Sequence, residues 1–242
     1  MRPETLALDL VDAVRQQAVN ASVSTPAVRG ADWRMATVAT IAADGTVTTS
    51  DGIPVRRMET YVSPIVGDLI YITQSGAGDW LAWGRSSTGG VAIGETVPAR
   101  KPISTSRAST TTLAADPHLT VTASPGTYKL DAFLMYDADA AADLKLGWIA
   151  PAGTTGAWWP GAADSGMAGL AASPRWGAVT DVGTTTLPLG AIGAGTIVAA
   201  RPVGTVVITT AGTFALAWAQ QASSATPTVL RGQSTLEMRR IA

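Results

Sequence analysis

Side chains suited to nucleophilic or acid–base catalysis are scarce in this sequence. Its 242 residues include one histidine, His118, and no cysteine, so a serine nucleophile would have a single candidate for its base. His118 follows Pro117 at the entrance to an expected strand, which favours a structural or surface role. Gly190, Gly193 and Gly195 precede an expected strand and not a helix, so they indicate a turn and not a dinucleotide site. No Gly-x-Ser-x-Gly turn, phosphate-binding loop or metalloprotease helix occurs.

Carboxylates that could act on a sugar or hold a cation form the next group. A glycosidase needs two carboxyl groups across one cleft, but the glutamates fall in four separate parts of the chain: Glu4, Glu59, Glu95 and Glu237. Asp137, Asp139 and Asp143 offer oxygen ligands for calcium, yet their loop departs from the EF-hand pattern, and a solvated loop is the favoured interpretation. We therefore expect no enzymatic activity, no catalytic residue, no cofactor and no bound metal.

Trp158 and Trp159, flanked by Gly156 and Gly161, are the feature most typical of a binding site. Aromatic rings in a loop stack on sugar rings or anchor interfaces. The pair is therefore a candidate contact with a host glycan or with another subunit. Packing in the core or at a trimer interface is the favoured alternative, and the sequence leaves both interpretations open.

Composition narrows the class of protein. Charged residues make up 14% of the chain and hydrophobic residues 46%, whereas charged residues average about 25% in globular domains. The 17 basic and 18 acidic residues are spread out, so nucleic acid is not an expected partner. No apolar run approaches the roughly 20 residues that span a bilayer, and the N-terminal residues do not form a signal peptide. We expect synthesis in the cytoplasm, no membrane insertion, and a surface that packs against copies of itself.

One segment has helical periodicity, and it defines the first predicted region, residues 1–30. Residues 3–21 carry two narrow apolar stripes at helical spacing. Such a helix packs either on the following domain or against other copies of the chain. The residues expected to take part in oligomer packing are Leu6, Leu10, Val11 and Val14.

Residues 31–86 change to a period of two. Trp33, Met35 and Thr37 lie on one face of a first strand, and Asp44-Gly45 is a strong tight-turn signal. Five short strands in about 55 residues are typical of a small closed barrel of the oligonucleotide/oligosaccharide-binding (OB) type. Residues 87–106, rich in Ser, Thr and Gly, are predicted to be a linker.

Residues 107–242 predict a second β domain, whose roughly nine strands suit a two-sheet sandwich of the jelly-roll type. In its strand from Phe214 to Gln221, bulky side chains alternate with alanines. Ala215, Ala217 and Ala219 would let another sheet approach closely, so we expect them at a subunit contact. The predicted fold class is all-β with a short N-terminal helix, an OB-like barrel and then a jelly-roll-type sandwich.

Short motifs follow one another in a definite order along both predicted domains. The barrel contains Asp44-Gly45, Gly52 to Arg57, Gly67-Asp68 and Trp80 to Gly84. The second domain contains Ser109 to Leu113, Tyr128, Asp143 to Trp148, Pro151 to Gly153, Leu216 to Gln220 and Arg231 to Leu236. In this order the motifs resemble the small barrel and the C-terminal head domain of minor tail proteins of actinobacterial siphophages.

The resemblance implies a homotrimeric fibre or tail-tip protein, with a head similar in topology to tumour-necrosis-factor or C1q domains. The long shaft that usually joins the two parts is absent, so a compact tail-tip component fits as well as a fibre. The implied partners are copies of the chain, other phage tail proteins and a host cell-surface glycan, and the implied location is the virion tail. The alternatives are a lectin-like carbohydrate-binding module for adhesion to the host wall and, less favoured, an enzyme that degrades wall polysaccharide.

Overall fold

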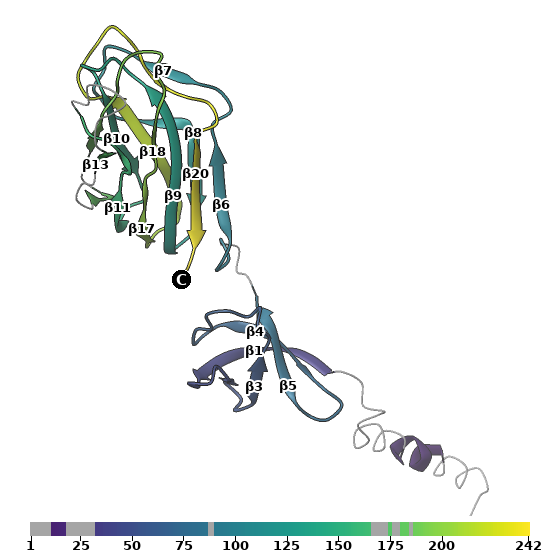
Figure 1. The fold of residues 1–242 in the computed structure, drawn as a ribbon. Coiled ribbons are helices and arrows are strands. Elements are labelled where there is room, and N and C mark those ends of the chain that lie inside the picture. The colour runs from purple at the N-terminus through teal and green to yellow at the C-terminus, as the bar shows by residue number, and fades with distance from the viewer. Residues whose placement is uncertain (1–10, 18–31, 87–89, 166–173, 176–179, 184–185) are drawn as a thin grey trace, which may run out of the picture. The chain divides into compact units, whose positions relative to one another are not determined.

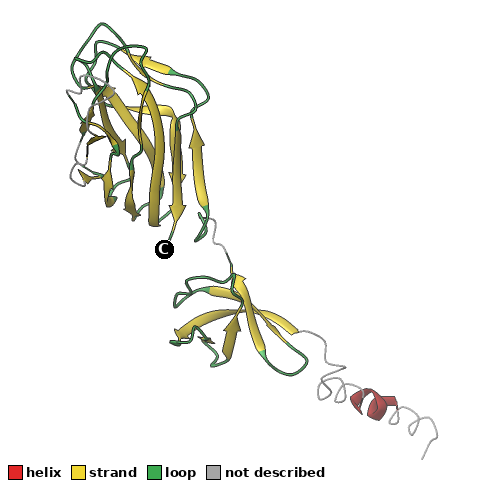
Figure 2. Ribbon diagram, viewed as in Figure 1, coloured by secondary structure: helices red, strands yellow, loops and turns green. Residues whose placement is uncertain are grey.

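The computed structural model describes residues 11–17, 32–86, 90–165, 174–175, 180–183 and 186–242. The chain forms two compact units, residues 1–88 and 89–242, each described here by itself (Figure 1). Strands dominate both units, and the described part of the chain contains one α-helix, residues 11–17 (Figure 2). No helix among these residues is long and apolar enough to cross a membrane.

The first unit contains a closed five-stranded barrel in the order β1-β2-β3-β5-β4, with β4 pairing back onto β1. Its strands are β1 (Asp32–Ile41), β2 (Val47–Thr49), β3 (Pro54–Arg57), β4 (Leu69–Gln74) and β5 (Trp80–Arg85). Neighbouring strands are antiparallel except β3 and β5, which run parallel. The predicted barrel is confirmed.

Tight turns and compact side chains explain why this segment closes on itself. Asp44 accepts a hydrogen bond from the backbone N–H of Thr46 at 2.9 Å, and Gly45 adopts a φ of +84°, which glycine tolerates without strain. The barrel core consists of Ala36, Val38, Val47, Val55, Tyr61, Ile70, Ile72 and Ala82. Most of these side chains are small or branched because a five-stranded barrel has a narrow interior.

The second unit is a sandwich of two main sheets. The smaller has the order β15 (Leu187–Leu189), β10 (Leu144–Ile149), β18 (Gly212–Gln220) and β8 (Ala114–Ala123). The larger has the order β14 (Thr180–Asp181), β11 (Thr155–Trp159), β17 (Val203–Ile208), β9 (Gly126–Asp137), β19 (Thr228–Leu230) and β7 (Thr105–Arg107). β9 also pairs with β16 (Val198–Ala200) and β20 (Thr235–Arg240), and β20 pairs with β6 (Thr96–Arg100). A separate ribbon joins β12 (Ala162–Ala163) to β13 (Pro174–Arg175).

The core of the sandwich forms between alternate residues of the two sheets. From β9 in the larger sheet come Tyr128, Leu130, Leu134 and Tyr136, all without exposed surface. From the smaller sheet come Leu119, Leu144, Leu146, Phe214, Leu216 and Trp218. This alternation is the period-two pattern of a strand with one buried face. The predicted fold class, all-β with an N-terminal helix, an OB-like barrel and a sandwich, is therefore confirmed.

The predicted linker is wrong over its second half, because residues 96–100 and 105–107 form strands of the sandwich. β6 pairs with β20 along its whole length, and β7 pairs with β19. β6 has no other strand partner among the described residues, so Pro98 can occupy this edge strand without removing a hydrogen bond that a second neighbour would need. The boundary between the two units falls at Thr88 and Gly89.

A buried ion pair connects the two sheets of the sandwich. Lys101, directly after β6, places its Nζ atom 2.5 Å from Oδ2 of Asp116 in β8, and neither side chain has exposed surface. Asp116 also accepts hydrogen bonds from the backbone N–H groups of His118 and Leu119 and from Nε1 of Trp218, at 2.9, 3.1 and 3.1 Å. The carboxylate is thus surrounded by donors, as a buried charge requires.

Candidate functional site

The residues considered for catalysis lie in separate parts of the described structure. His118 is half-buried in β8, and its backbone N–H donates to Oδ1 of Asp116. Among the glutamates, Glu4 lies outside the described residues, and three are exposed on different elements: Glu59, Glu95 and Glu237.

One carboxylate pair was not predicted. Asp131 on β9 stands directly across from Glu237 on β20, beside a shallow pocket of about 340 Å³. Arg201 donates to both carboxylate oxygens of Asp131, at 3.1 and 2.9 Å. Because both oxygens of Asp131 are engaged, this carboxylate serves as an ion-pair partner in the structure.

The loop with Asp137, Asp139 and Asp143 is hydrogen-bonded to segments that are distant in the sequence. Asp137 accepts a hydrogen bond from Nε of Arg231 at 2.5 Å, and Asp143 accepts one from the backbone N–H of Ala191 at 2.8 Å. Both carboxylates are buried, whereas Asp139 is half-buried. The predicted solvated loop is therefore wrong for Asp137 and Asp143, which the fold uses to tie distant segments together. Across the described ranges, no cluster of three or more His, Cys, Asp or Glu residues is arranged to hold a metal ion.

Trp158 and Trp159 do not form a shared platform. Trp158 is 1% exposed and packs edge-on against Trp148, with ring centroids 5.7 Å apart. Its partner across β11 and β17 is Gly204, where a Cβ atom would lie 2.8 Å from Cβ of Trp158. The possible contact of Trp158 with a glycan or another subunit is therefore wrong, and the favoured alternative, packing in the core, is confirmed for this residue. Trp159 points from the other face of β11 and is half-buried, so its part in a contact stays a prediction.

The residues expected to form oligomer contacts differ in their exposure. Ala215, Ala217 and Ala219 are all buried within the single chain, so the prediction that they offer a free surface to another subunit is wrong. The alternation along β18 is real, but both of its faces are covered. Val11 and Val14 are 48% and 57% exposed on the described helix. Leu6 and Leu10 lie outside the described residues.

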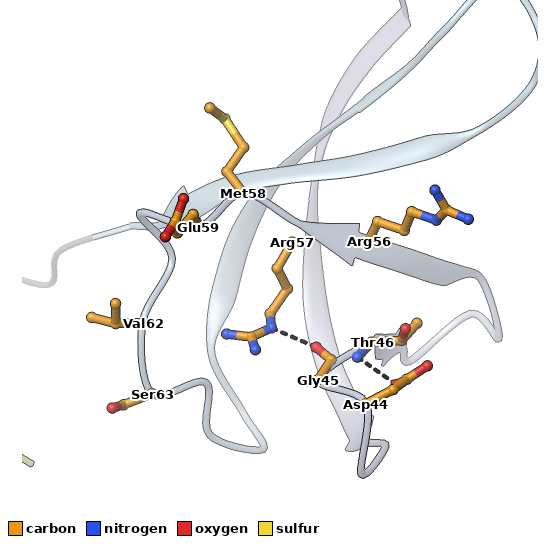
Figure 3. A pocket seen from close by; sticks show the side chains of 9 residues that line it. All are labelled: Asp44, Gly45, Thr46, Arg56, Arg57, Met58, Glu59, Val62 and Ser63. Carbon is orange, nitrogen blue, oxygen red and sulfur yellow. Dashed lines mark hydrogen bonds between the residues drawn. The ribbon is translucent and has the colours of Figure 1, made fainter.

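The barrel carries an open polar pocket of about 660 Å³ (Figure 3). It lies between the β1–β2 turn, β3 and the loop that follows β3, close to where barrels of this type place ligands. Its lining residues are Asp44, Gly45, Thr46, Arg56, Arg57, Met58, Glu59, Val62 and Ser63. Acidic and basic side chains are both present.

Arg57 uses this pocket to clamp two loops together. Its Nε donates to the carbonyl of Gly45 at 2.5 Å, and its Nη1 donates to the carbonyl of Tyr61 at 2.6 Å. Figure 3 shows the bond to Gly45 and shows Arg56 leaving β3 in a different direction. Asp44 is held by its bond from Thr46, which lowers the pKa of the Asp44 carboxyl. The described hydrogen bonds of this pocket therefore support a structural role.

A second surface of the barrel is aromatic and uncharged. The outer sides of β1, β4 and β5 carry six side chains, here called the aromatic face: Trp33, Met35, Leu69, Tyr71, Thr73 and Trp83. The register of β1 and β4 places Trp33 beside Thr73, Met35 beside Tyr71, and Thr37 beside Leu69. Trp33 is 68% exposed and Trp83 is 56% exposed. Nε1 of Trp83 donates to Oγ1 of Thr73 at 2.9 Å, which fixes this ring against the sheet.

Sequence reasoning placed Trp33 and Met35 on one side of a strand but did not identify that side as a surface. The feature of the sequence that could have identified it is the opposite side of the same strand, where Ala36 and Val38 occupy the alternate positions. In β1 these smaller side chains face the narrow interior of the barrel, and the larger Trp33 and Met35 stand on the exposed side.

Comparisons with known proteins leave the family unassigned. No family model and no curated protein matches the sequence. The chain is similar to a structure of the infectious bursal disease virus Gx strain, with a TM-score of 0.30 and 9% identity, over 87% of this chain and 52% of that one. It is also similar to the VP2 subviral particle of infectious bursal disease virus, with a TM-score of 0.17 and 10% identity, over 87% and 61%. The chain thus spans about half the length of the first of these proteins. TM-scores of this size assign neither a fold family nor a function, and the resemblance to siphophage tail proteins stays a prediction.

Proposed function

We propose that this protein is a non-enzymatic structural subunit of a phage tail, at the tail tip or in a fibre, and that it assembles as a homotrimer. Its N-terminal part attaches to other tail proteins, and its C-terminal sandwich faces the host surface. The ordered motifs that resemble siphophage minor tail proteins support this proposal. So does the division of a charge-poor, cysteine-free chain into two β units.

The observation that carries the proposal is a helix whose side chains are all exposed. Every residue from 11 to 17 is solvent-accessible in the single chain, including Val11 and Val14. A helix without tertiary contacts is only marginally stable in water, because most helical stability in proteins comes from packing an apolar face. Packing against the same helix of other copies would cover Val11 and Val14 and stabilise the helix.

The charged side chains of the folded units support a structural role. The ion pair of Arg201 and Asp131 ties the segment after β16 to β9, and Arg85 donates to Asp68 at 3.2 Å beside the loop after β3. These ion pairs stabilise local geometry and bring no nucleophile to a base. We therefore propose that the protein does not cleave host polysaccharide. Incubation with purified wall polymers should release no reducing sugar, and release that disappears on neutralising Glu237 would contradict the proposal.

The first test is the mass of the purified full-length chain, measured by light scattering behind a sizing column. A mass three times the 24.7 kDa of one chain is expected. The unfolding temperature should also rise with protein concentration, because a trimer is stabilised by mass action. A monomer at micromolar concentration would contradict the trimeric assembly.

A second candidate function is carbohydrate binding, and the aromatic face favours it. Two exposed tryptophans on one rigid sheet are typical of surfaces that contact a partner. The location differs from the predicted one, because the exposed pair is Trp33 and Trp83 on the barrel and not Trp158 and Trp159 on the sandwich.

A further inference from the structure

We infer that the aromatic face of the barrel binds a neutral oligosaccharide. The inference deepens the proposed role in host attachment by naming a ligand class and a site. The ring of Trp83 is held by the bond from its Nε1 atom to Thr73, and Trp33 lies beside Thr73 across β1 and β4. Both rings are thus mounted on paired strands, which lowers the entropy that a ligand must lose on binding.

The polar groups of this face suit sugar hydroxyls. The Nε1 atom of Trp33 and the hydroxyl of Tyr71 have no hydrogen-bond partner within the described residues, and both side chains are exposed. Thr37, at the edge of the face, adds an exposed hydroxyl. Aromatic rings offer apolar surface to the C–H groups of a sugar ring, while these donors and acceptors offer hydrogen bonds at its edges.

The lack of positive charge on the aromatic face argues against an anionic ligand. None of the six side chains of the aromatic face belongs to an acidic or basic residue type. Arg34, the neighbour of Trp33 in sequence, turns to the other side of β1, where it stacks over Trp80 and pairs with Asp51. Binding of nucleic acid depends on cations that neutralise phosphates. A neutral glycan needs no such cations.

The area of the aromatic face argues against a second copy of the chain as its binding partner. A Trp or Tyr side chain buries roughly 150–250 Å² when fully covered. The partly exposed rings of Trp33, Tyr71 and Trp83, with Met35 and Leu69, therefore present on the order of 500 Å². A stable protein interface buries about 800 Å² on each partner. The aromatic face is large enough for a short oligosaccharide but falls below what a stable dimer needs.

The test is calorimetric titration of the full-length protein with neutral hexasaccharides of glucose, mannose, galactose and N-acetylglucosamine. A hexamer of galacturonate serves as the anionic comparison. We expect at least one neutral hexamer to bind, and Trp33→Ala and Trp83→Ala each to weaken that binding about tenfold, the equivalent of losing one aromatic contact. Phe133→Ala removes an aromatic ring that is 44% exposed on the sandwich and should leave the affinity unchanged.

Four results would overturn the inference: no neutral hexamer binds, the alanine variants bind as the wild type does, galacturonate binds equally well, or the alanine variants lose trimer mass. The last result would make the aromatic face an interface between copies. Trp83→Phe keeps a ring while removing the N–H group that bonds to Thr73, so it should retain part of the affinity even if an alanine variant folds poorly. A monomer that binds the glycan through Trp33 would contradict the trimer and leave this inference standing.

Discussion

Nζ of Lys101 lies 2.5 Å from Oδ2 of Asp116, and the two side chains have no exposed surface. Lys101 follows β6 of the larger sheet, whereas Asp116 belongs to β8 of the smaller sheet. The ion pair therefore bridges the two layers of the sandwich. The ring of Trp218 donates to the same carboxylate and is itself covered by Arg107, whose guanidinium carbon lies 4.2 Å from the ring centroid.

Removing the lysine should destabilise the sandwich strongly. Lys101→Met leaves Asp116 buried without its cation, and breaking a buried pair in this way costs about 3–5 kcal/mol. Urea unfolding followed by circular dichroism measures the loss. Lys129→Met removes an exposed lysine from β9 and should change stability by less than about 0.5 kcal/mol. Equal effects of the two variants would contradict a special role for the buried pair.

The same carboxylate should make stability depend on pH. Burial raises the pKa of Asp116, but the hydrogen bonds from Lys101, His118 and Trp218 outweigh burial, so the net pKa is lowered. A carboxyl whose folded pKa is depressed contributes stability above its unfolded pKa of about 3.9 and loses it as pH falls through the folded pKa. The stability difference between the wild type and Asp116→Asn should therefore shrink below about pH 4. A difference that stays constant down to about pH 2 would contradict this assignment.

The two adjacent tryptophans of β11 should respond differently to truncation. Trp158→Ala empties a core site beside Trp148 and should cost about 3–5 kcal/mol. Trp159→Ala removes a half-buried ring and should cost less. Thermal unfolding of both variants provides the comparison. If both losses are small, the placement of Trp158 in the core is wrong.

The helix should control assembly. Val14→Asp places a carboxylate on the exposed apolar stripe and should convert the proposed trimer to a monomer, because a charge cannot be buried without a partner. Gln16→Asp adds the same charge on the opposite side of the helix and should leave the mass unchanged. Light scattering compares the two masses. Dissociation of both variants would show that added charge, and not the Val14 position, is responsible.

Local patterns predicted the barrel correctly because three of its strand pairs, β1–β2, β2–β3 and β4–β5, join strands that follow one another in sequence. Asp44-Gly45 and the period of two from Trp33 were enough to place the β1–β2 hairpin. The strands that were missed pair over long distances. Arg100 of β6 bonds to Gln233, 133 residues away, and no local pattern in a Ser/Thr-rich segment reveals such a partner.

Side-chain orientation was harder to predict than strand position. Two adjacent tryptophans must point to opposite faces of a strand, but alternation does not say which of them is inside. The residues that surround Trp158, such as Trp148 of β10 and Gly204 of β17, lie on other strands. In the same way, the alanines of β18 were assigned to a free surface because the burial of both faces depends on residues remote in the sequence.

The position of β20 sets an order of events during synthesis. β20 is the last described strand along the chain, yet it lies between β9 and β6 and bonds to both. The ribosome makes the barrel segment, β6 and β9 long before it reaches Arg240. The barrel can therefore fold early, whereas the edges of β6 and β9 that pair with β20 stay open until β20 has been made. Unpaired strand edges are prone to associate with other chains. Nascent chains paused before β20 should therefore be the form of this protein that most needs a chaperone.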